Sequence, residues 1–158
     1  MKKVILGATG SIGSTLAKSL VKSGEEVHLV GRDNASLSSL ANELNSSFTT
    51  CDMLEENFTD QILSDLDGTP VNGLAYCVGS IDLKPLKLIK KSDFMQSFNL
   101  NLVSAAETIK ALADNLKQNK GSIVLFSTVA VKQGFPNHAI VSSAKGAVEG
   151  LTLALAAE

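Results

Sequence analysis

The most constraining feature of the sequence is the segment Val4–Gly13, where an apolar run leads into three glycines spaced three residues apart. Gly7, Gly10 and Gly13 stand where a buried strand would pass into a helix. Without Cβ atoms, such a turn can approach a pyrophosphate closely and direct helix N–H groups at it. The spacing G-x-x-G-x-x-G differs from the usual G-x-G-x-x-G dinucleotide motif. A tight strand-to-helix turn without a ligand is therefore the alternative.

The composition indicates a single globular domain. The 158 residues suffice for one core but not for two ordinary domains. A hydrophobic content of 44% and a formal charge of −2 are not those of a disordered chain, and no basic cluster indicates nucleic acid as a partner. The chain shows no secretory leader and no apolar stretch of membrane-spanning length. We therefore expect a cytoplasmic protein with no membrane or metal, in which Cys51 and Cys77 are buried free thiols.

Short apolar runs alternate with helical patterns along the chain. Strands separated by helices form βαβ units, and hence a parallel sheet with helices on both faces. We predict a doubly wound α/β fold whose ligand crevice lies at the carboxyl ends of the strands. The predicted strands are Val4–Gly7, Val27–Gly31, Phe48–Cys51, Gly73–Cys77 and Ser122–Ser127. The predicted helices are Ile12–Ser23, Ala35–Leu44, Phe58–Leu66, Ser92–Lys117 and one from about Ala139 to the end, with a loop over the crevice at Val78–Lys91.

The apolar helical pattern from Ala144 to Glu158 carries no Gly, Asn or Pro stop signal. A buried helix is normally followed by a segment on which it packs. We therefore expect the chain to be part of a longer protein, with a five-stranded domain complete in itself as the alternative.

With the glycine loop, Asn101, Thr128 and Lys145 in place, the chain resembles the short-chain dehydrogenase/reductase family along its whole length. The resemblance implies one Rossmann-type NAD(P)-binding domain over residues 1–158 and oxidoreduction of a carbonyl or alcohol. It also implies further C-terminal strands and a substrate lobe, and a homodimer or homotetramer formed through the last two long helices. The small residues that would permit close approach of these helices are Ala144, Gly146, Ala147 and Gly150.

The resemblance also implies which cofactor is bound. Arg32 follows the second predicted strand, where NADP-preferring members hold the 2′-phosphate, and a guanidinium is a planar, permanently charged donor. Gly31 replaces the acidic residue of NAD-preferring members, so NADP(H) is expected rather than NAD(H). A solvated surface charge is the alternative for Arg32. Asp52 resembles the aspartate that binds the adenine amino group, although Asp is also a common helix cap.

The family's Asn-Asn-Ala-Gly segment reads Tyr76-Cys77-Val78-Gly79 here, so only the glycine is kept. Gly79 still lets the backbone pass close to the nicotinamide ribose, whereas the hydrogen bonds of the lost asparagines are in doubt. The cofactor-binding residues that the resemblance implies are Gly7, Thr9, Gly10, Ser11, Ile12, Gly13, Arg32, Asp52, Met53, Cys77, Gly79 and Lys145.

The family's catalytic Asn, Ser, Tyr and Lys read Asn101, Thr128, Val141 and Lys145 in this chain. In the family the asparagine holds a water that connects the lysine to solvent, but a satisfied core amide is the alternative here. Thr128 keeps the hydroxyl and adds a methyl group, whereas Val141 cannot transfer a proton. A positioned acid contributes on the order of 10²–10⁴ in rate, so this loss is substantial.

Few side chains could replace the missing phenol. His138, one turn before Val141, is the best surrogate because imidazole titrates near neutral pH, although a structural or solvated histidine is the alternative. Ser142 and Ser143 point in other directions from a helix, and Tyr76 lies on the wrong element.

Three functions are compatible with this pattern: an NADP-dependent oxidoreductase, a non-catalytic NADP(H)-binding protein, and a self-associating subunit, which can coexist with either. The glycine loop and Arg32 favour cofactor binding under the first two functions. Lys145 favours the oxidoreductase and Val141 the non-catalytic protein. We expect an NADP(H)-binding oxidoreductase with a non-standard proton relay through Thr128, Lys145 and His138.

Overall fold

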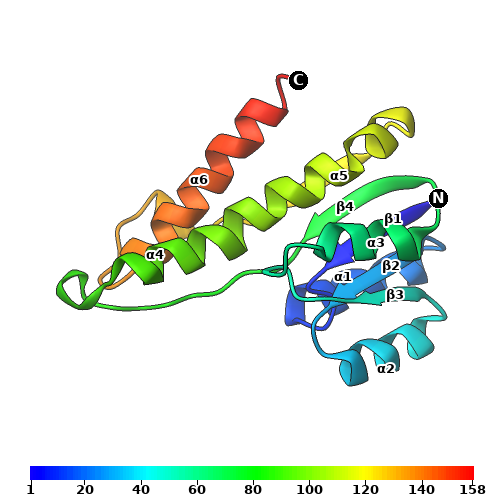
Figure 1. The fold of residues 1–158 in the computed structure, drawn as a ribbon, viewed down its shortest axis with the longest axis horizontal. Coiled ribbons are helices and arrows are strands. Elements are labelled where there is room, and N and C mark those ends of the chain that lie inside the picture. Colours follow the sequence, from blue (N-terminus) through cyan, green and yellow to red (C-terminus); the bar gives the residue numbers. More distant parts are fainter. The chain divides into compact units, whose positions relative to one another are not determined.

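A five-stranded parallel sheet organises the computed structural model, which describes residues 1–158 (Figure 1). Its strands are β1 (Lys2–Leu6), β2 (Glu26–Gly31), β3 (Ser47–Thr50), β4 (Val71–Tyr76) and β5 (Ser122–Leu125), in the order β3-β2-β1-β4-β5. The chain winds outward in one direction from β1 to β3 and in the other from β4 to β5. The predicted doubly wound α/β sheet is confirmed, and its switch point lies between β1 and β4.

The helices follow the predicted pattern. They are α1 (Ser11–Lys22), α2 (Asn34–Leu44), α3 (Phe58–Leu66), α4 (Lys91–Phe98), α5 (Ser104–Gln118) and α6 (Ala139–Leu155). The predicted helix over Ser92–Lys117 is observed as one helical run, in which a π-helical turn at Asn99–Val103 joins α4 to α5. In this wider turn Ser104 Oγ donates to Asn99 O at 2.8 Å. One extra residue in a turn hardly changes the apolar period, so the sequence pattern does not show it.

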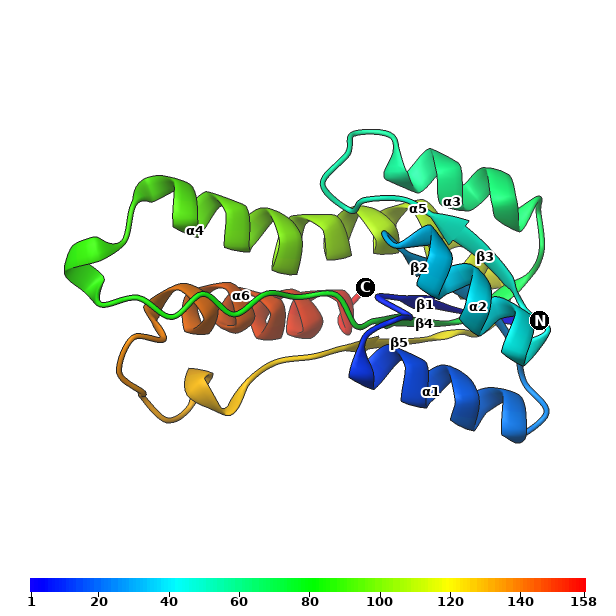
Figure 2. The same cartoon turned by 90° about the horizontal axis from the view of Figure 1, so that it is seen from below.

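The chain forms two compact units. The first comprises Met1–Val78 and Glu107–Val124, and the second comprises Gly79–Ala106 and Leu125–Glu158. In the first unit α1 and α2 lie on one face of the sheet and α3 lies on the other (Figure 2). In the second unit α4 and α6 pack against one another.

A continuous apolar cluster joins the sheet of the first unit to α1 and α2. Ile5, Leu29 and Leu37 are completely buried in it. Burying a side chain of this size contributes about 1.5–3 kcal/mol, so this cluster supplies much of the stability of the unit. Its other buried members are Ala8, Ala17, Val27, Leu40 and Ala41.

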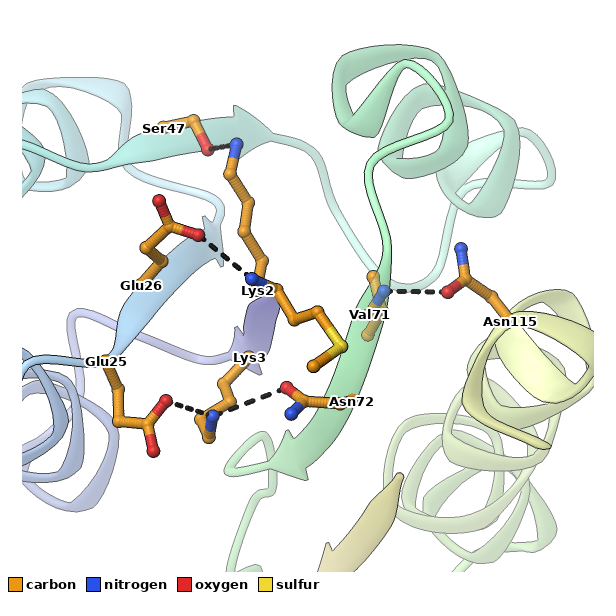
Figure 3. Close-up of polar contacts among 9 residues, drawn as sticks. Lys2, Lys3, Glu25, Glu26, Ser47, Val71, Asn72 and Asn115 are labelled. Carbon is orange, nitrogen blue, oxygen red and sulfur yellow. Dashed lines mark hydrogen bonds and ion pairs between the residues drawn. The ribbon is translucent and has the colours of Figure 1, made fainter. Parts of the chain in front are cut away.

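Polar contacts gather at the amino ends of the strands, as Figure 3 shows. Lys3 Nζ donates to a carboxylate oxygen of Glu25 and to Asn72 Oδ1. The Val71 N–H at the start of β4 donates to Asn115 Oδ1 on α5 at 2.7 Å (Figure 3). These contacts fix the start of β4.

Several large apolar side chains are exposed. Ile123 and Val124 on the edge strand β5 are 39% and 48% exposed, and Leu86 in the loop before α4 is 75% exposed.

None of the helices is both long and apolar enough to cross a membrane.

We predict that Gly13→Ala lowers the free energy of unfolding by about 2–4 kcal/mol, because an added Cβ would meet rigid backbone. At Gly13 that Cβ would lie 2.9 Å from Ala8 Cα and closer still to Gly7 O. Gly150→Ala is the matched control, since nothing lies within 4 Å of its added Cβ and α6 gains a better helix former. Urea unfolding followed by circular dichroism measures both variants. An equal change in the two variants would contradict the prediction.

Candidate functional site

The glycine loop of the first unit packs backbone against backbone. Gly7 has φ +72°, and a Cβ there would lie 2.9 Å from Cys77 O on the neighbouring strand end. A Cβ on Gly13 would collide with Gly7 O, as above. Gly10 is less crowded, with Gly7 O at 3.3 Å from its added Cβ. Two of the three glycines are therefore required by close packing alone, whether or not a ligand binds.

The N-terminus of α1 follows this loop and has the features of an anion site. Its N-cap is Gly10, no side chain caps it, and no acidic residue stands in its first turn. The Ser14 N–H is the first to donate within the helix, to Gly10 O at 2.9 Å, so the N–H groups of Ser11, Ile12 and Gly13 precede the helical ladder. Backbone N–H groups at a helix start bind phosphate oxygens, so a dinucleotide diphosphate fits here.

Two predicted cofactor residues near this helix start are exposed. Thr9 lies on the surface of the loop, and the Ile12 side chain is 53% exposed. Ile12 therefore does not join the core, although it has the same helical period as Leu16, Ala17 and Leu20. Leu16, Ala17 and Leu20 do pack on the core.

Arg32 and Asp52 lie together after neighbouring strands of the sheet. Arg32 Nη1 is 3.7 Å from Asp52 Oδ2, and the arginine side chain is 75% exposed. An exposed pair of this kind contributes little stability, and the guanidinium keeps most of its donors for a ligand. Asp33 Oδ1 accepts from Ala35 N and caps α2. A Cβ added to Gly31 would lie 3.7 Å from Thr9 Oγ1, which is an ordinary contact.

Other predicted cofactor residues of the first unit are less accessible. Asp52 Oδ1 accepts from Leu54 N at 3.0 Å, so this carboxylate also fixes the turn after β3. Met53 is buried. Cys51 and Cys77 are free thiols, and burial raises the pKa of Cys51 to about 12 and raises that of Cys77 as well. Both sulfurs therefore stay protonated near neutral pH and are poor nucleophiles.

In the second unit, Asn101, Gly79 and Lys145 converge. Asn101 is buried in the π-turn, where its Nδ2 donates to Ser97 O at 3.0 Å. Its Oδ1 is buried without a hydrogen-bond partner. A Cβ added to Gly79 would lie 2.9 Å from this Oδ1 and 3.4 Å from Lys145 Nζ, so the chain at residue 79 passes close to both. An orphaned buried acceptor beside an amine marks a place for an unseen polar partner.

Burial also favours the neutral form of the Lys145 amine. Removal from water lowers the pKa of its amine below the ordinary value near 10.5. Val141, one turn earlier on α6, is 3% exposed and offers no polar atom. The site therefore has a lysine of lowered pKa and no phenol beside it.

Thr128 stands at the end of the segment after β5. Its Oγ1 accepts from Ala130 N at 3.3 Å, which leaves the hydroxyl hydrogen free to donate to a ligand. A hollow of about 550 Å³ in the second unit is lined by Ser127, Thr128, Val129, Lys132, Gln133 and Glu149. Ser127 Oγ donates to Glu149 Oε1 at 2.6 Å within this lining.

His138 directly precedes α6 as its N-cap residue. Its Nδ1 lies 2.7 Å from Pro136 O, and because a carbonyl only accepts, Nδ1 carries the hydrogen. Nε2 is then the basic atom and could take up and release a proton. Ser142 Oγ donates to Ala130 O and Ser143 Oγ to Ala139 O, so both hydroxyl hydrogens are already used.

Sequence reasoning missed three features of these clusters. The π-turn that presents Asn101 leaves no clear periodic signal. Glu149 reaches Ser127 across the fold, which spacing along the chain does not indicate. The Arg32–Asp52 pair follows from the order of strands β2 and β3, and the sequence predicted both residues without predicting their contact. Tyr76 is buried in β4 of the first unit.

Comparison with known proteins identifies the family of the chain. The model of the family described as short chain dehydrogenase matches residues 2–158. The chain belongs to the short-chain dehydrogenase family. This confirms the resemblance inferred from the glycine loop, Asn101, Thr128 and Lys145.

Two relatives within the family are L-xylulose reductase of Bos taurus and carbonyl reductase [NADPH] 2 of Sus scrofa. The first is 31% identical over 160 residues, covering 99% of this chain and 65% of the relative. The second is 30% identical over 161 residues, covering 100% of this chain and 65% of the relative. The chain thus spans 65%, slightly less than two thirds, of the length of each of these two relatives.

A solved structure of a short chain dehydrogenase/reductase family protein superposes with a TM-score of 0.92. It is 24% identical and covers 99% of this chain and 67% of the other chain. A likeness at this identity concerns the fold alone, and it agrees with the doubly wound sheet.

We predict that Lys145 is acylated with a pH midpoint below the ordinary lysine value near 10.5, since burial favours its neutral amine. Pulse labelling with acetic anhydride from pH 7 to 11, read by peptide mass spectrometry, gives the midpoint. Labelling of the exposed Lys91 in the same sample controls for reagent decay. A midpoint at or above 10.5 for Lys145 would contradict the effect of burial.

Proposed function

We propose that the chain is the dinucleotide-binding part of an NADP(H)-dependent oxidoreductase that interconverts a carbonyl and an alcohol. The observation that carries the proposal is the uncapped start of α1, where the N–H groups of Ser11, Ile12 and Gly13 precede the helical hydrogen bonds. The family supports oxidoreduction in general. The relative named as an NADPH carbonyl reductase supports this cofactor.

In this proposal the first unit holds the phosphates of the cofactor. The N–H groups that open α1 donate to the diphosphate, and Arg32 binds the adenosine 2′-phosphate. Asp52, already 3.7 Å from the guanidinium, keeps it oriented and accepts from the adenine amino group. The absence of a side chain at Gly31 removes the carboxylate that would repel a 2′-phosphate.

The second unit supplies the chemistry on the substrate side. The bound nicotinamide supplies or accepts the hydride, and the protein moves the accompanying proton. Thr128 donates its free hydroxyl hydrogen to the substrate oxygen. Lys145 binds the ribose hydroxyls, and the unpaired Asn101 Oδ1 holds a water beside it. His138 Nε2 replaces the missing phenol as the proton donor and acceptor, because its Nδ1–H is fixed on Pro136 O.

A second candidate function is a non-catalytic NADP(H)-binding protein, and the buried Val141 favours it. The loop, Arg32 and Asp52 would serve this function unchanged. The two candidate functions differ only in whether His138, Lys145 and Thr128 take part in turnover of a substrate.

We further propose that copies of the chain associate through α5 and α6. Gly150 and Leu153 on α6 support this, since open space surrounds the glycine and the leucine is 75% exposed. Ala144 is fully buried within its own unit, so Gly146, Ala147 and Gly150 are the remaining small residues for a contact. Reduced thiols at Cys51 and Cys77 fit a cytoplasmic protein.

We predict that the protein binds NADPH more tightly than NADH and that Arg32→Ala removes this preference. A lost charge-assisted contact of about 1.5–3 kcal/mol weakens NADPH by roughly 10- to 100-fold and leaves NADH nearly unchanged. Gly31→Asp is the complementary variant, because its Cβ fits the available space and its carboxylate would repel the 2′-phosphate. Fluorescence titration measures all affinities. Equal affinities of the wild-type protein for both cofactors would refute the role of Arg32.

We predict that the protein oxidises NADPH with a carbonyl substrate, and that His138→Ala and Lys145→Ala each lower kcat by about 10²–10⁴. Lys91→Ala, an exposed lysine of the same unit, is the control. NADPH that binds and is never oxidised by a carbonyl panel would favour the non-catalytic protein.

A further inference from the structure

His28 is completely buried in β2 of the first unit, and both its ring nitrogens have partners. Nδ1 lies 2.8 Å from Ser47 Oγ, and Nε2 lies 2.9 Å from Thr49 Oγ1. Each hydroxyl in turn meets a charged group. Lys2 Nζ donates to Ser47 Oγ at 2.8 Å (Figure 3), and Thr49 Oγ1 donates to Asp65 Oδ2 at 2.7 Å.

The directions of these four hydrogen bonds follow from the Asp65 end. The Asp65 carboxylate only accepts, so Thr49 gives its hydrogen to Asp65 and accepts from His28 Nε2. Nδ1 of a neutral imidazole then carries no hydrogen, so it accepts from Ser47 Oγ, which in turn accepts from the Lys2 ammonium. The chain Lys2–Ser47–His28–Thr49–Asp65 therefore fixes the neutral imidazole with its hydrogen on Nε2.

The charged groups that face this histidine come from β1 and α3. Lys2 lies on β1 and Asp65 on α3, and Asp60 lines the same hollow of about 410 Å³ as Asp65. Burial is the main reason that the pKa of His28 falls to about 4, with a smaller contribution from Lys2 that Asp65 partly opposes. The folded state therefore resists protonation at pH values where an exposed histidine is already charged.

Protonation would reverse one bond of this chain. A charged imidazole donates from both nitrogens, so Ser47 Oγ would accept from Nδ1–H as well as from Lys2, and its own hydrogen would lose Nδ1 as its acceptor. The charge would also be buried with no carboxylate in direct hydrogen-bond contact. β3 and α3 carry Ser47, Thr49 and Asp65, so separation of these elements from β2 would return the charge to water.

The position of these elements links His28 to the proposed cofactor site. β2 ends at Gly31, directly before Arg32, and β3 ends at Thr50, two residues before Asp52. We propose that His28 is an acid-sensitive lock that holds β3 and α3 onto β2, and thereby holds the adenosine-phosphate end of the dinucleotide site in place. The effect on the dinucleotide rests on the proposed function, whereas the lock itself does not.

The first test uses the two histidines of the wild-type chain as each other's control. Long-range ¹H–¹⁵N spectra of the imidazoles at pH 7 should show His28 as the Nε2–H tautomer and His138, held by Pro136 O, as the Nδ1–H tautomer. The His28 signals should titrate only near pH 4. A His28 that is the Nδ1–H tautomer, or that titrates at or above pH 6.5, would overturn the lock.

The second test measures local opening by amide hydrogen exchange, corrected for the intrinsic pH dependence. Between pH 7 and 5, linkage through a histidine pKa that changes from 6.5 to about 4 should raise the opening constant of β3 and α3 about twenty-fold. His28→Gln, which does not titrate, should abolish this increase. Unchanged protection in the wild-type protein, or the same increase in His28→Gln, would refute the lock. If this variant does not fold, the spectra of the wild-type histidines decide.

Binding of adenosine 2′,5′-bisphosphate separates the lock from the proposed function. The affinity for this ligand should fall between pH 7 and 5 by a larger factor in the wild-type protein than in His28→Gln. The variant is the control for titration of the ligand phosphates, which affects both proteins equally. An equal fall in both proteins would refute the regulatory part of the proposal. Absence of binding at pH 7 would refute the proposed function, and hydrogen exchange would still decide on the lock.

Discussion

Close backbone contact between the start of α1 and the end of β1 is the constraint on which the cofactor site depends. Gly13 lies against Gly7, and Gly7 lies against the backbone of Cys77 at the end of β4. Any side chain at these two positions would separate helix from strand. The contact brings the free N–H groups of α1 to the carboxyl edge of the sheet at the switch point between β1 and β4. Packing and anion binding thus require the same residues.

In the proposed function, the second unit works with one group of the family's site replaced. Asn101, Gly79 and Lys145 lie close together, and burial lowers the pKa of the lysine amine. Val141 removes the phenol without disturbing α6, because it is packed inside the unit. In the proposed function the proton carrier is His138, whose tautomer is set by a backbone carbonyl. Proton transfer by His138 would therefore depend on this hydrogen bond rather than on a charged neighbour.

The sequence predicted most of the fold because its signals are local. Apolar runs and helical periods placed all five strands and α1 to α3 within two residues of their observed bounds. Features that depend on contacts across the sheet were not predictable in this way. Ile12 has the right period for the packed face, yet its side chain is exposed at the helix start. The π-turn at Asn101 and the partners of His28 arise from the register of separate elements, which one sequence does not specify.

The central claim is that the N–H groups at the start of α1 hold the diphosphate of a bound dinucleotide. The most direct measurement is the change in ¹H–¹⁵N amide shifts as NADPH is added to the labelled protein. The account predicts that the largest changes fall on Ser11, Ile12 and Gly13, with downfield proton shifts typical of donation to phosphate. Binding of NADPH that leaves these three amides unchanged would contradict it.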